Sequence, residues 1–253
     1  MFNAFYNRLV KYKLVVCGDP LSKIIKFFSK TIYYFPGFLR IIYSRYIMRW
    51  PTVGVFPGEL YLHDKFWERR LKVSTTGLKD TELHDGLRYE ATPYLLIRDI
   101  FDRMALTEDD VLVDLGCGKA RTLCFSERFC KAKLLGVEYD NKLADTAKEN
   151  LKNTAVEVSC MKAQDFDYSK ITAIYLYNPF GEKTVAAVLE KLHQSLIDNP
   201  RKVKIAYANP VHDDLLASLD WLEFEETWST KQYPHFYVFP RHGRAVSFWH
   251  TKI

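Results

Sequence analysis

The chain has 253 residues, of which 48% are hydrophobic, and its net charge is +5. This length suits one α/β domain with additions, and the hydrophobic fraction excludes a chain that is disordered throughout. The five cysteines form no C-x-x-C pair, which argues against a zinc site or a disulfide framework. We therefore expect a globular protein of the reducing cytoplasm.

The basic charge is concentrated in the N-terminal segment. Residues 1–50 contain nine Lys and Arg but only one acid, Asp19, so they carry +8 and the rest of the chain carries −3. Residues 21–33 and 38–50 have the spacing of two amphipathic helices, each with apolar and aromatic residues opposite cations. Every apolar run is interrupted before the about 18 residues that a membrane span needs.

Residues 1–50 allow more than one interpretation. Basic, aromatic and amphipathic helices are typical of a segment on an anionic membrane surface, here the inner face of the cytoplasmic membrane. Alternatively, the helices pack on the domain with their cations in water. A basic segment also suits nucleic acid. We describe residues 1–50 as a helical extension, followed at 51–92 by a loop-rich joint without a clear period.

From residue 93 onward, predicted strands and helices alternate. Apolar spacing predicts helices at 93–104, 120–130, 143–151, 183–197 and 212–219. Short apolar runs predict parallel strands at 111–113, 134–137, 156–160, 171–177 and 203–207, and a closing antiparallel pair at 224–228 and 245–249. This order predicts an α/β domain over 93–253, a Rossmann-like, doubly wound and mainly parallel sheet of seven strands with helices on both faces.

A glycine-rich loop follows the first predicted strand. Residues 114–121 read Asp-Leu-Gly-Cys-Gly-Lys-Ala-Arg and open a helix. Gly116 and Gly118 permit a tight turn and let a ligand approach the backbone at a helix N-terminus. A bare G-x-G suits any nucleotide. However, Asp114 ends the first strand, and Glu138 ends the second, 22 residues after Gly116, where an acid can bind both ribose hydroxyls. The loop therefore predicts a nucleoside site.

This octet resembles the first motif of class I S-adenosylmethionine-dependent methyltransferases, and it is most similar to bacterial members with a D-x-G-C-G-K-G-R loop. The resemblance covers roughly residues 75–250. It implies S-adenosylmethionine as the cofactor, with Asp114 near the ammonium, Gly116 and Gly118 around the methionine end, and Glu138 on the ribose. Ala120 replaces the third glycine of the pattern, a small departure that we expect to be tolerated.

The resemblance implies further cofactor contacts with less regular matches. Related enzymes often place an Asp near the adenine amine after strand three, but Lys162 stands there in this chain. Either Asp165 reaches the adenine, or the backbone of Ala163 and Gln164 does.

Upstream, Tyr89 and Thr92 match a Tyr-x-x-(T/S/P)-Pro element that folds over the cofactor in related proteins. Both residues are expected to line the methionine end, with residues 51–92 covering the site. A purely structural interpretation is also compatible, in which Thr92 caps the following helix and Pro93 occupies its first turn.

Asn178-Pro179-Phe180 follows the fourth predicted strand, at the sheet edge where ligands bind. It resembles the (D/N)-P-P-(Y/F) signature of methyltransferases that act on amines, with one Pro missing. Asn178 can accept an N–H bond and keep the nitrogen lone pair aimed at the methyl group, and Phe180 can favour the developing cation. We predict these two residues as catalytic. The alternative is an Asn-Pro turn that ends the strand, with Phe180 in the core.

Taken together, these residues predict a methyltransferase that uses S-adenosylmethionine to methylate an amine nitrogen of a protein or a small molecule. One alternative is a non-catalytic, membrane-associated module that only binds the cofactor. Another is an NAD(P)-linked oxidoreductase, but its G-x-G-x-x-G pattern needs a glycine where Arg121 stands. The seven histidines lack ligand spacing, so no metal is predicted.

Overall fold

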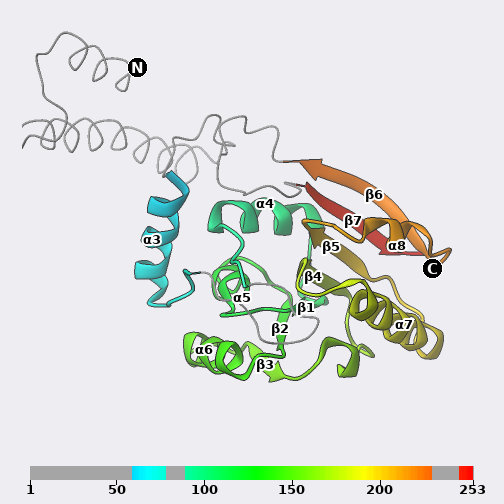
Figure 1. Cartoon of the computed structure of the whole chain (residues 1–253), viewed down its shortest axis with the longest axis horizontal. Helices are drawn as coiled ribbons and strands as arrows, with labels where there is room; N and C mark the ends of the chain where they lie inside the picture. Colours follow the sequence, from blue (N-terminus) through cyan, green and yellow to red (C-terminus); the bar gives the residue numbers. More distant parts are fainter. Residues whose placement is uncertain (1–58, 78–88, 230–244, 253) are drawn as a thin grey trace, which may run out of the picture. The chain divides into compact units, whose positions relative to one another are not determined.

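The computed structural model describes residues 59–77, 89–229 and 245–252 (Figure 1). Within these residues, seven strands form one sheet in the order β3-β2-β1-β4-β5-β7-β6. The strands are β1 (Val111–Leu115), β2 (Lys133–Glu138), β3 (Glu157–Cys160), β4 (Ala173–Tyr177), β5 (Lys204–Ala208), β6 (Leu222–Ser229) and β7 (Ala245–Thr251). The first five run parallel, and β7 runs antiparallel to both of its neighbours. The predicted fold class and the closing antiparallel pair are therefore confirmed.

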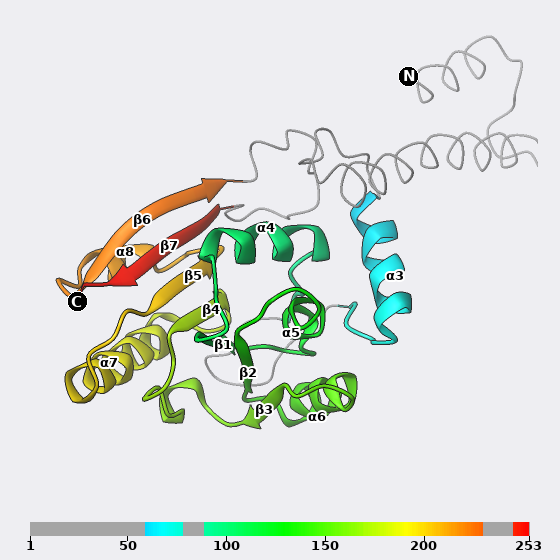
Figure 2. The same ribbon diagram turned by 180° about the vertical axis from the view of Figure 1, so that it is seen from behind.

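Helices cover both faces of this sheet. They are α4 (Tyr94–Met104), α5 (Arg121–Ser126), α6 (Asn141–Leu151), α7 (Glu182–Asp198) and α8 (Asp213–Ala217), with a short 3-10 turn, η2, at Ala163–Asp165. A further helix, α3 (Glu59–Leu71), precedes them in the chain. Successive side chains of β4 point to opposite faces of the sheet. Ile174 packs in the same buried cluster as Val188 of α7, whereas the ring of Tyr175 contacts Phe101 of α4, with 5.9 Å between the ring centroids. In Figure 2 the antiparallel pair lies at the opposite end of the sheet from β3.

Two helices differ from the sequence prediction. The helix predicted at 120–130 ends at Ser126, because the chain passes into tighter turns in which Phe129 N–H bonds to the Ser126 carbonyl. In the stretch expected to be loop-rich, residues 59–71 form α3. The sequence of α3 shows no clear apolar spacing, because the helix buries a charged residue, Glu68, beside Trp67. From Asp64 onward the chain belongs with the sheet.

The basic extension, residues 1–50, lies outside the described residues, and so do both helices predicted within it. Among the helices that the structure describes, none is long and apolar enough to span a bilayer.

Candidate functional site

The glycine-rich loop lies at the point where the sheet reverses its strand order. The chain moves outward from β1 to β2 and β3, and then returns to place β4 on the other side of β1. Gly116 (φ +72°) and Gly118 (φ +57°) adopt the left-handed conformation that makes the turn after β1 possible. The N–H groups of Gly116 and Cys117 donate to the Val137 carbonyl at 2.8 and 3.0 Å, which holds the loop against the end of β2. This is where parallel α/β sheets bind their ligands.

Two buried carboxylates flank this loop. Glu138, at the end of β2, accepts the N–H of Gly118 on one oxygen and the N–H of Asp140 on the other, both at 2.8 Å. Asp114, in β1, is only 3% exposed. The pKa of Asp114 is raised to about 8, mainly by burial and also by the nearby Glu138 carboxylate, while a hydrogen bond from Thr122 opposes both. Burial also raises the pKa of Glu138. Within the part of the chain that the structure describes, the site therefore concentrates acidic groups that no cation pairs with.

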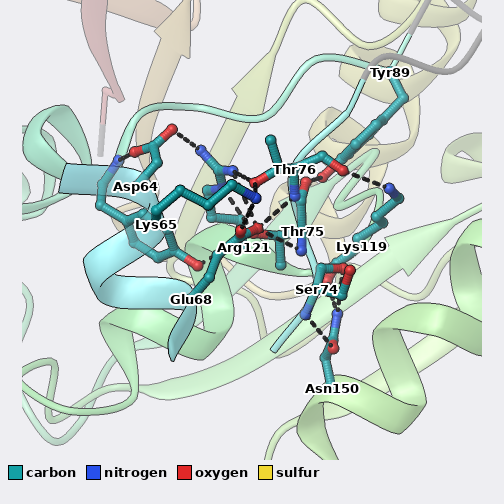
Figure 3. Close-up of polar contacts among 11 residues, drawn as sticks. Asp64, Lys65, Glu68, Ser74, Thr75, Thr76, Tyr89, Lys119, Arg121 and Asn150 are labelled. Atoms are coloured by element: carbon teal, nitrogen blue, oxygen red, sulfur yellow. Dashed lines mark hydrogen bonds and ion pairs between the residues drawn. The ribbon is translucent and has the colours of Figure 1, made fainter. Parts of the chain in front are cut away.

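The two cations of the loop are held by the upstream part of the chain (Figure 3). Arg121 is 4% exposed and pairs with Asp64 of α3 at 2.6 Å and with Glu68 at 3.7 Å. The ammonium of Lys119 donates to the carbonyl of Thr76 at 2.9 Å. Arg121 is therefore neutralised by two acids, whereas Lys119 keeps its charge and is bonded to a neutral carbonyl.

Residues 72–77, which we call the cover segment, lie against the glycine-rich loop (Figure 3). Asn150 of α6 donates to the carbonyls of Lys119 and Ser74 and so joins the loop to the cover segment. Glu68 of α3 anchors the segment from the other side. Burial would raise the pKa of Glu68, but hydrogen bonds from Thr76, Lys65 and Thr75 outweigh it and lower that pKa to about 2. Sequence analysis did not identify this network, and its one signal was the pair of acids four residues apart in α3.

Tyr89 lies directly over the glycine-rich loop. A Cβ atom added to Gly118 would come within 2.2 Å of its ring, and its hydroxyl donates to the carbonyl of Thr75 at 2.7 Å. Burial raises the pKa of this hydroxyl, which therefore stays protonated as a donor. The structure thus brings Tyr89 to the predicted cofactor site, together with Asp114, Gly116 and Glu138.

Thr92 is buried, and its hydroxyl shares a 2.7 Å hydrogen bond with that of Tyr175 in β4. The interpretation of Thr92 as a helix cap is wrong, because the N-cap position of α4 is Pro93, without a side-chain bond. The Tyr94 N–H is instead satisfied by the carboxylate of Asp64 at 3.3 Å. Thr92 therefore reaches the sheet rather than the helix backbone.

The Asn-Pro-Phe motif meets the loop through its proline. A Cβ atom on Gly116 would come within 2.3 Å of the Pro179 side chain. Any larger residue at 116 would therefore displace the end of β4, whether or not a cofactor fills the site. Asn178, in a left-handed conformation (φ +38°), accepts a hydrogen bond from Tyr207 at 3.2 Å. Phe180 is 9% exposed and packs in the core, as the structural interpretation of this motif expects.

The two candidate adenine contacts, the Asp165 side chain and the backbone of Ala163 and Gln164, have different surroundings in the structure. Asp165 is exposed in η2, and its N–H donates to the Lys162 carbonyl. The Ala163 carbonyl already accepts the Phe166 N–H at 3.2 Å and the Tyr168 hydroxyl at 2.8 Å. Both lone pairs of that oxygen are thus engaged, so it is not free to read a base.

Two residues near the loop have a defined local role. Asp140 caps α6, because its side chain accepts the N–H of Leu143 at 2.9 Å. Ala120 is fully buried with φ +61°, the conformation that explains the glycine of the related pattern. A non-glycine residue there costs roughly 1 kcal/mol, a small penalty for a folded domain. Among the described residues, no group of His, Cys, Asp and Glu could hold a metal ion.

The chain has partial likenesses to known proteins. No family model matches the chain. An uncharacterised protein of Methanocaldococcus jannaschii is 31% identical over 94 residues, which cover 36% of this chain and 38% of that protein. The match therefore spans well under half of that relative.

Several solved structures share the architecture at low identity. One is an RNA methyltransferase from Salinibacter ruber in complex with S-adenosyl-L-homocysteine, at 21% identity, covering 65% of this chain and 96% of that one, with a TM-score of 0.44. A TehB-like SAM-dependent methyltransferase from Corynebacterium glutamicum is 18% identical, covering 78% and 100%, with a TM-score of 0.46. These likenesses concern the fold, so the reaction has to follow from the site.

Proposed function

We propose that this protein is an S-adenosylmethionine-dependent methyltransferase whose cofactor binds across the carboxyl ends of β1 and β2. One observation carries the proposal: Asp114 and Glu138 are buried beside a glycine-rich turn whose own cations are engaged elsewhere. An acidic site of this kind suits a ligand that brings positive charge and a ribose. S-Adenosylmethionine has an ammonium, a sulfonium and a ribose, whereas a dinucleotide would bring a pyrophosphate.

The donor set fits this cofactor. The Glu138 carboxylate accepts backbone N–H groups on both oxygens, and with about four lone-pair sites in total it keeps acceptor capacity for a ribose hydroxyl. We assign Asp114 to the ammonium, and we assign Tyr89, over the loop, and Thr92, bonded to Tyr175 of β4, to the methionine side. When bound, the cofactor supplies an electrophilic methyl group. The residues of the chain hold and orient it.

We also propose an amine nitrogen, of a protein or a small molecule, as the methyl acceptor. The Tyr207 hydroxyl accepts the His212 N–H at 3.4 Å, and its own hydrogen is directed to the side-chain oxygen of Asn178. That oxygen keeps a second lone pair for an N–H of the acceptor. Because Pro179 packs on Gly116, Asn178 stands beside the methionine end of the site. Phe180 supports this arrangement from the core.

The two alternatives differ from this proposal in observable ways. An NAD(P)-linked oxidoreductase needs a small residue where Arg121 starts α5, and in this chain that residue is a buried cation in an ion pair. A non-catalytic module would bind the cofactor without turning it over. Labelled methyl transfer from S-adenosylmethionine separates it from an enzyme.

We expect S-adenosylmethionine and S-adenosylhomocysteine, but not NAD or NADP, to raise the melting temperature of the protein. Glu138→Gln removes a charge and one acceptor at the ribose, so it should weaken S-adenosylhomocysteine binding by about tenfold, the equivalent of one lost hydrogen bond to a charged group. Glu149→Gln, at an exposed pair on α6, is the matched control and should change nothing. Stabilisation by NAD alone would overturn the proposed function.

We expect Asn178→Ala to lower the rate of methyl transfer by about 100-fold, because the lost contact orients the nucleophile in the transition state. S-Adenosylhomocysteine affinity should stay within twofold of the parent. Asn178→Asp should retain part of the rate, since a carboxylate still accepts an N–H bond. Labelled transfer to a panel of amines and cell extracts measures the rates, and mass spectrometry locates the methyl group.

Asn209→Ala is the control for that experiment, because Asn209 also ends a strand before a proline with positive φ (+52°). An equal rate loss in both variants would assign Asn178 a role in the backbone only. A product methylated on oxygen or carbon would contradict the nitrogen assignment.

We further propose that residues 1–50 bind anionic membrane surfaces. Each basic residue near such a surface contributes on the order of 1 kcal/mol, and the segment has nine of them. The full-length protein should sediment with phosphatidylserine vesicles at low salt and be released at high salt, whereas a variant lacking residues 1–50 should not bind. Binding of the full-length protein to RNA instead of vesicles would assign the segment to nucleic acid.

A further inference from the structure

Tyr207 lies in β5, next to the strand that leads into Asn178. In the register of the sheet it is paired with Leu176 of β4, and it is fully buried. Its side chain belongs to the same buried cluster as Leu176 and Phe180, on the face of the sheet that α7 covers. The core therefore holds the ring, while the hydroxyl reaches the end of β4. Tyr207 belongs to none of the motifs on which the cofactor and acceptor assignments rest.

The hydroxyl of Tyr207 links a backbone donor to the side chain of Asn178. The main-chain N–H of His212 can only donate, so the hydroxyl accepts that bond, at 3.4 Å. The hydroxyl donates its own hydrogen to Oδ1 of Asn178, with 3.2 Å between the two oxygens. Burial raises the pKa of Tyr207 to about 12, so the hydroxyl keeps this hydrogen at neutral pH. The direction of both bonds is therefore set by the backbone before α8.

The amide of Asn178 needs a partner that fixes its orientation. The neighbouring residues hold its backbone, since Pro179 packs on Gly116 and Phe180 packs in the core. They do not fix the last torsion of the side chain, because the oxygen and nitrogen ends of an amide have nearly the same shape. A flipped amide would present N–H groups to the acceptor. Those groups would bond to the lone pair of the acceptor nitrogen and so withdraw it from the methyl group.

We propose that Tyr207 is a positioning residue for methyl transfer, whose hydroxyl holds the Asn178 amide with its oxygen toward the acceptor. The inference rests on the proposed function, since it requires an amine acceptor beside Asn178. The amide oxygen has two lone pairs, of which Tyr207 occupies one and the acceptor N–H takes the other. The acceptor nitrogen is then free to bond to the methyl carbon as the carbon–sulfur bond breaks. The electron pair of that bond stays on sulfur, and the methylated nitrogen releases its extra proton to solvent.

A double-mutant cycle between positions 207 and 178 tests the proposal in the full-length protein. Labelled transfer from S-adenosylmethionine to poly-L-lysine, n-butylamine and a cell extract gives the maximal rate and the half-saturating amount of acceptor. We expect Tyr207→Phe to lower the maximal rate by about tenfold, the equivalent of one hydrogen bond, with S-adenosylhomocysteine affinity within about twofold of the parent. In the Asn178→Asp background the same change should cost less than about threefold, because a carboxylate has no donor end to turn toward the acceptor.

Nuclear magnetic resonance provides a second readout, which needs neither cofactor nor acceptor. Protein with isotope-labelled asparagine should give one sharp pair of side-chain amide signals for Asn178, assigned by their loss in Asn178→Asp. In Tyr207→Phe this pair should broaden or double, because the amide then populates both orientations.

Ser247→Ala is the matched control for both readouts. Ser247 of β7 is paired with Tyr207 in the register of the sheet and is fully buried, but its hydroxyl bonds to Asp213 rather than to Asn178. The variant therefore loses a buried hydroxyl bond at the same place in the fold. We expect its rate and its Asn178 amide signals to match those of the parent.

An unchanged rate in Tyr207→Phe, unchanged Asn178 amide signals, or the same loss of rate in both backgrounds would refute the inference and leave the proposed function intact. Absence of labelled transfer to every acceptor would refute the proposed methylation of an amine, and this inference with it.

Discussion

Replacing Asp114 with asparagine is expected to stabilise the cofactor-free protein and, at the same time, to weaken cofactor binding by about 100-fold. Asp114 is buried near Glu138 without a cation, so its charged form is disfavoured in the folded state. Asparagine has the same shape without the charge. The loss of binding follows because a cofactor ammonium would lose a buried charged partner, which typically costs roughly 2–5 kcal/mol.

The stability gain has a defined pH dependence. The pKa of Asp114 is about 8 in the folded protein, above the roughly 3.9 of an unfolded aspartate. Between these values the folded state holds a proton that the unfolded state has lost, so the stability of the parent falls as pH rises from about 4 to about 8. The Asp114→Asn variant has no titratable group at this position, so this fall in stability is absent from it. The two proteins should therefore have similar stability at pH 4, and the variant should be more stable by up to roughly 5 kcal/mol at pH 8, since each pKa unit corresponds to about 1.4 kcal/mol.

Urea unfolding across this pH range measures the first effect, and titration with S-adenosylhomocysteine measures the second. The charged Asp114 is a cost to the fold, which is expected where a buried acid serves a ligand. If the variant is less stable than the parent at pH 8, or if its affinity for S-adenosylhomocysteine is unchanged, the assignment of Asp114 to the site is wrong.

Arg121→Met is expected to destabilise the fold by roughly 3–5 kcal/mol, the range found when one partner of a buried ion pair is removed. Arg121 pairs with Asp64 and Glu68, and its guanidinium lies 4.7 Å from the centroid of the Tyr94 ring. Burial already raises the pKa of Asp64, and Arg121 is the main group that opposes this rise. Methionine fills similar space but leaves Asp64 buried without its cation and leaves Glu68 with Lys65 alone.

The matched control is Arg98→Met, which removes an exposed Arg from an i,i+4 pair with Asp102 on α4. We expect it to cost below about 1 kcal/mol. Adding Asp64→Asn to Arg121→Met should recover part of the lost stability, because the uncompensated charge is then removed. Urea unfolding midpoints compare the stability of the parent, the two single variants and the double variant. Equal losses of stability for Arg121→Met and Arg98→Met would show that the buried ion pairs stabilise the fold no more than an exposed pair does.

The sequence predicted most of the fold because the strands of a parallel sheet are uniformly apolar. Val111-Leu112-Val113 and Leu134-Leu135-Gly136-Val137 are short buried runs between helical periods, and both are strands in the structure. The glycines of the loop were also informative, since a left-handed φ at Gly116 leaves little choice of residue. Helix α3 was missed because a helix that buries charged groups does not show an apolar stripe.

The candidate site was only partly predictable, for a related reason. Asp114 and Glu138 follow from strand ends and spacing, which are local features of the chain. The partners of Arg121 lie 53 and 57 residues earlier, and no periodicity connects them with the loop. The contact between Gly116 and Pro179 also depends on two strands that meet only in the folded sheet. Such pairings are set by tertiary structure, so single-sequence patterns do not report them.

The position of Asp64 bears on where the folded unit around the sheet begins. Its carboxylate joins three helices, since it lies on α3, accepts the first N–H of α4 and pairs with the first residue of α5. The repeating strand-and-helix pattern starts only at residue 93. A chain that began there would contain all seven strands, but the buried guanidinium of Arg121 would lack both of its acidic partners. The smallest fragment that keeps Arg121 together with its acidic partners therefore starts upstream of Asp64. That point lies before every residue of the nucleotide-binding pattern.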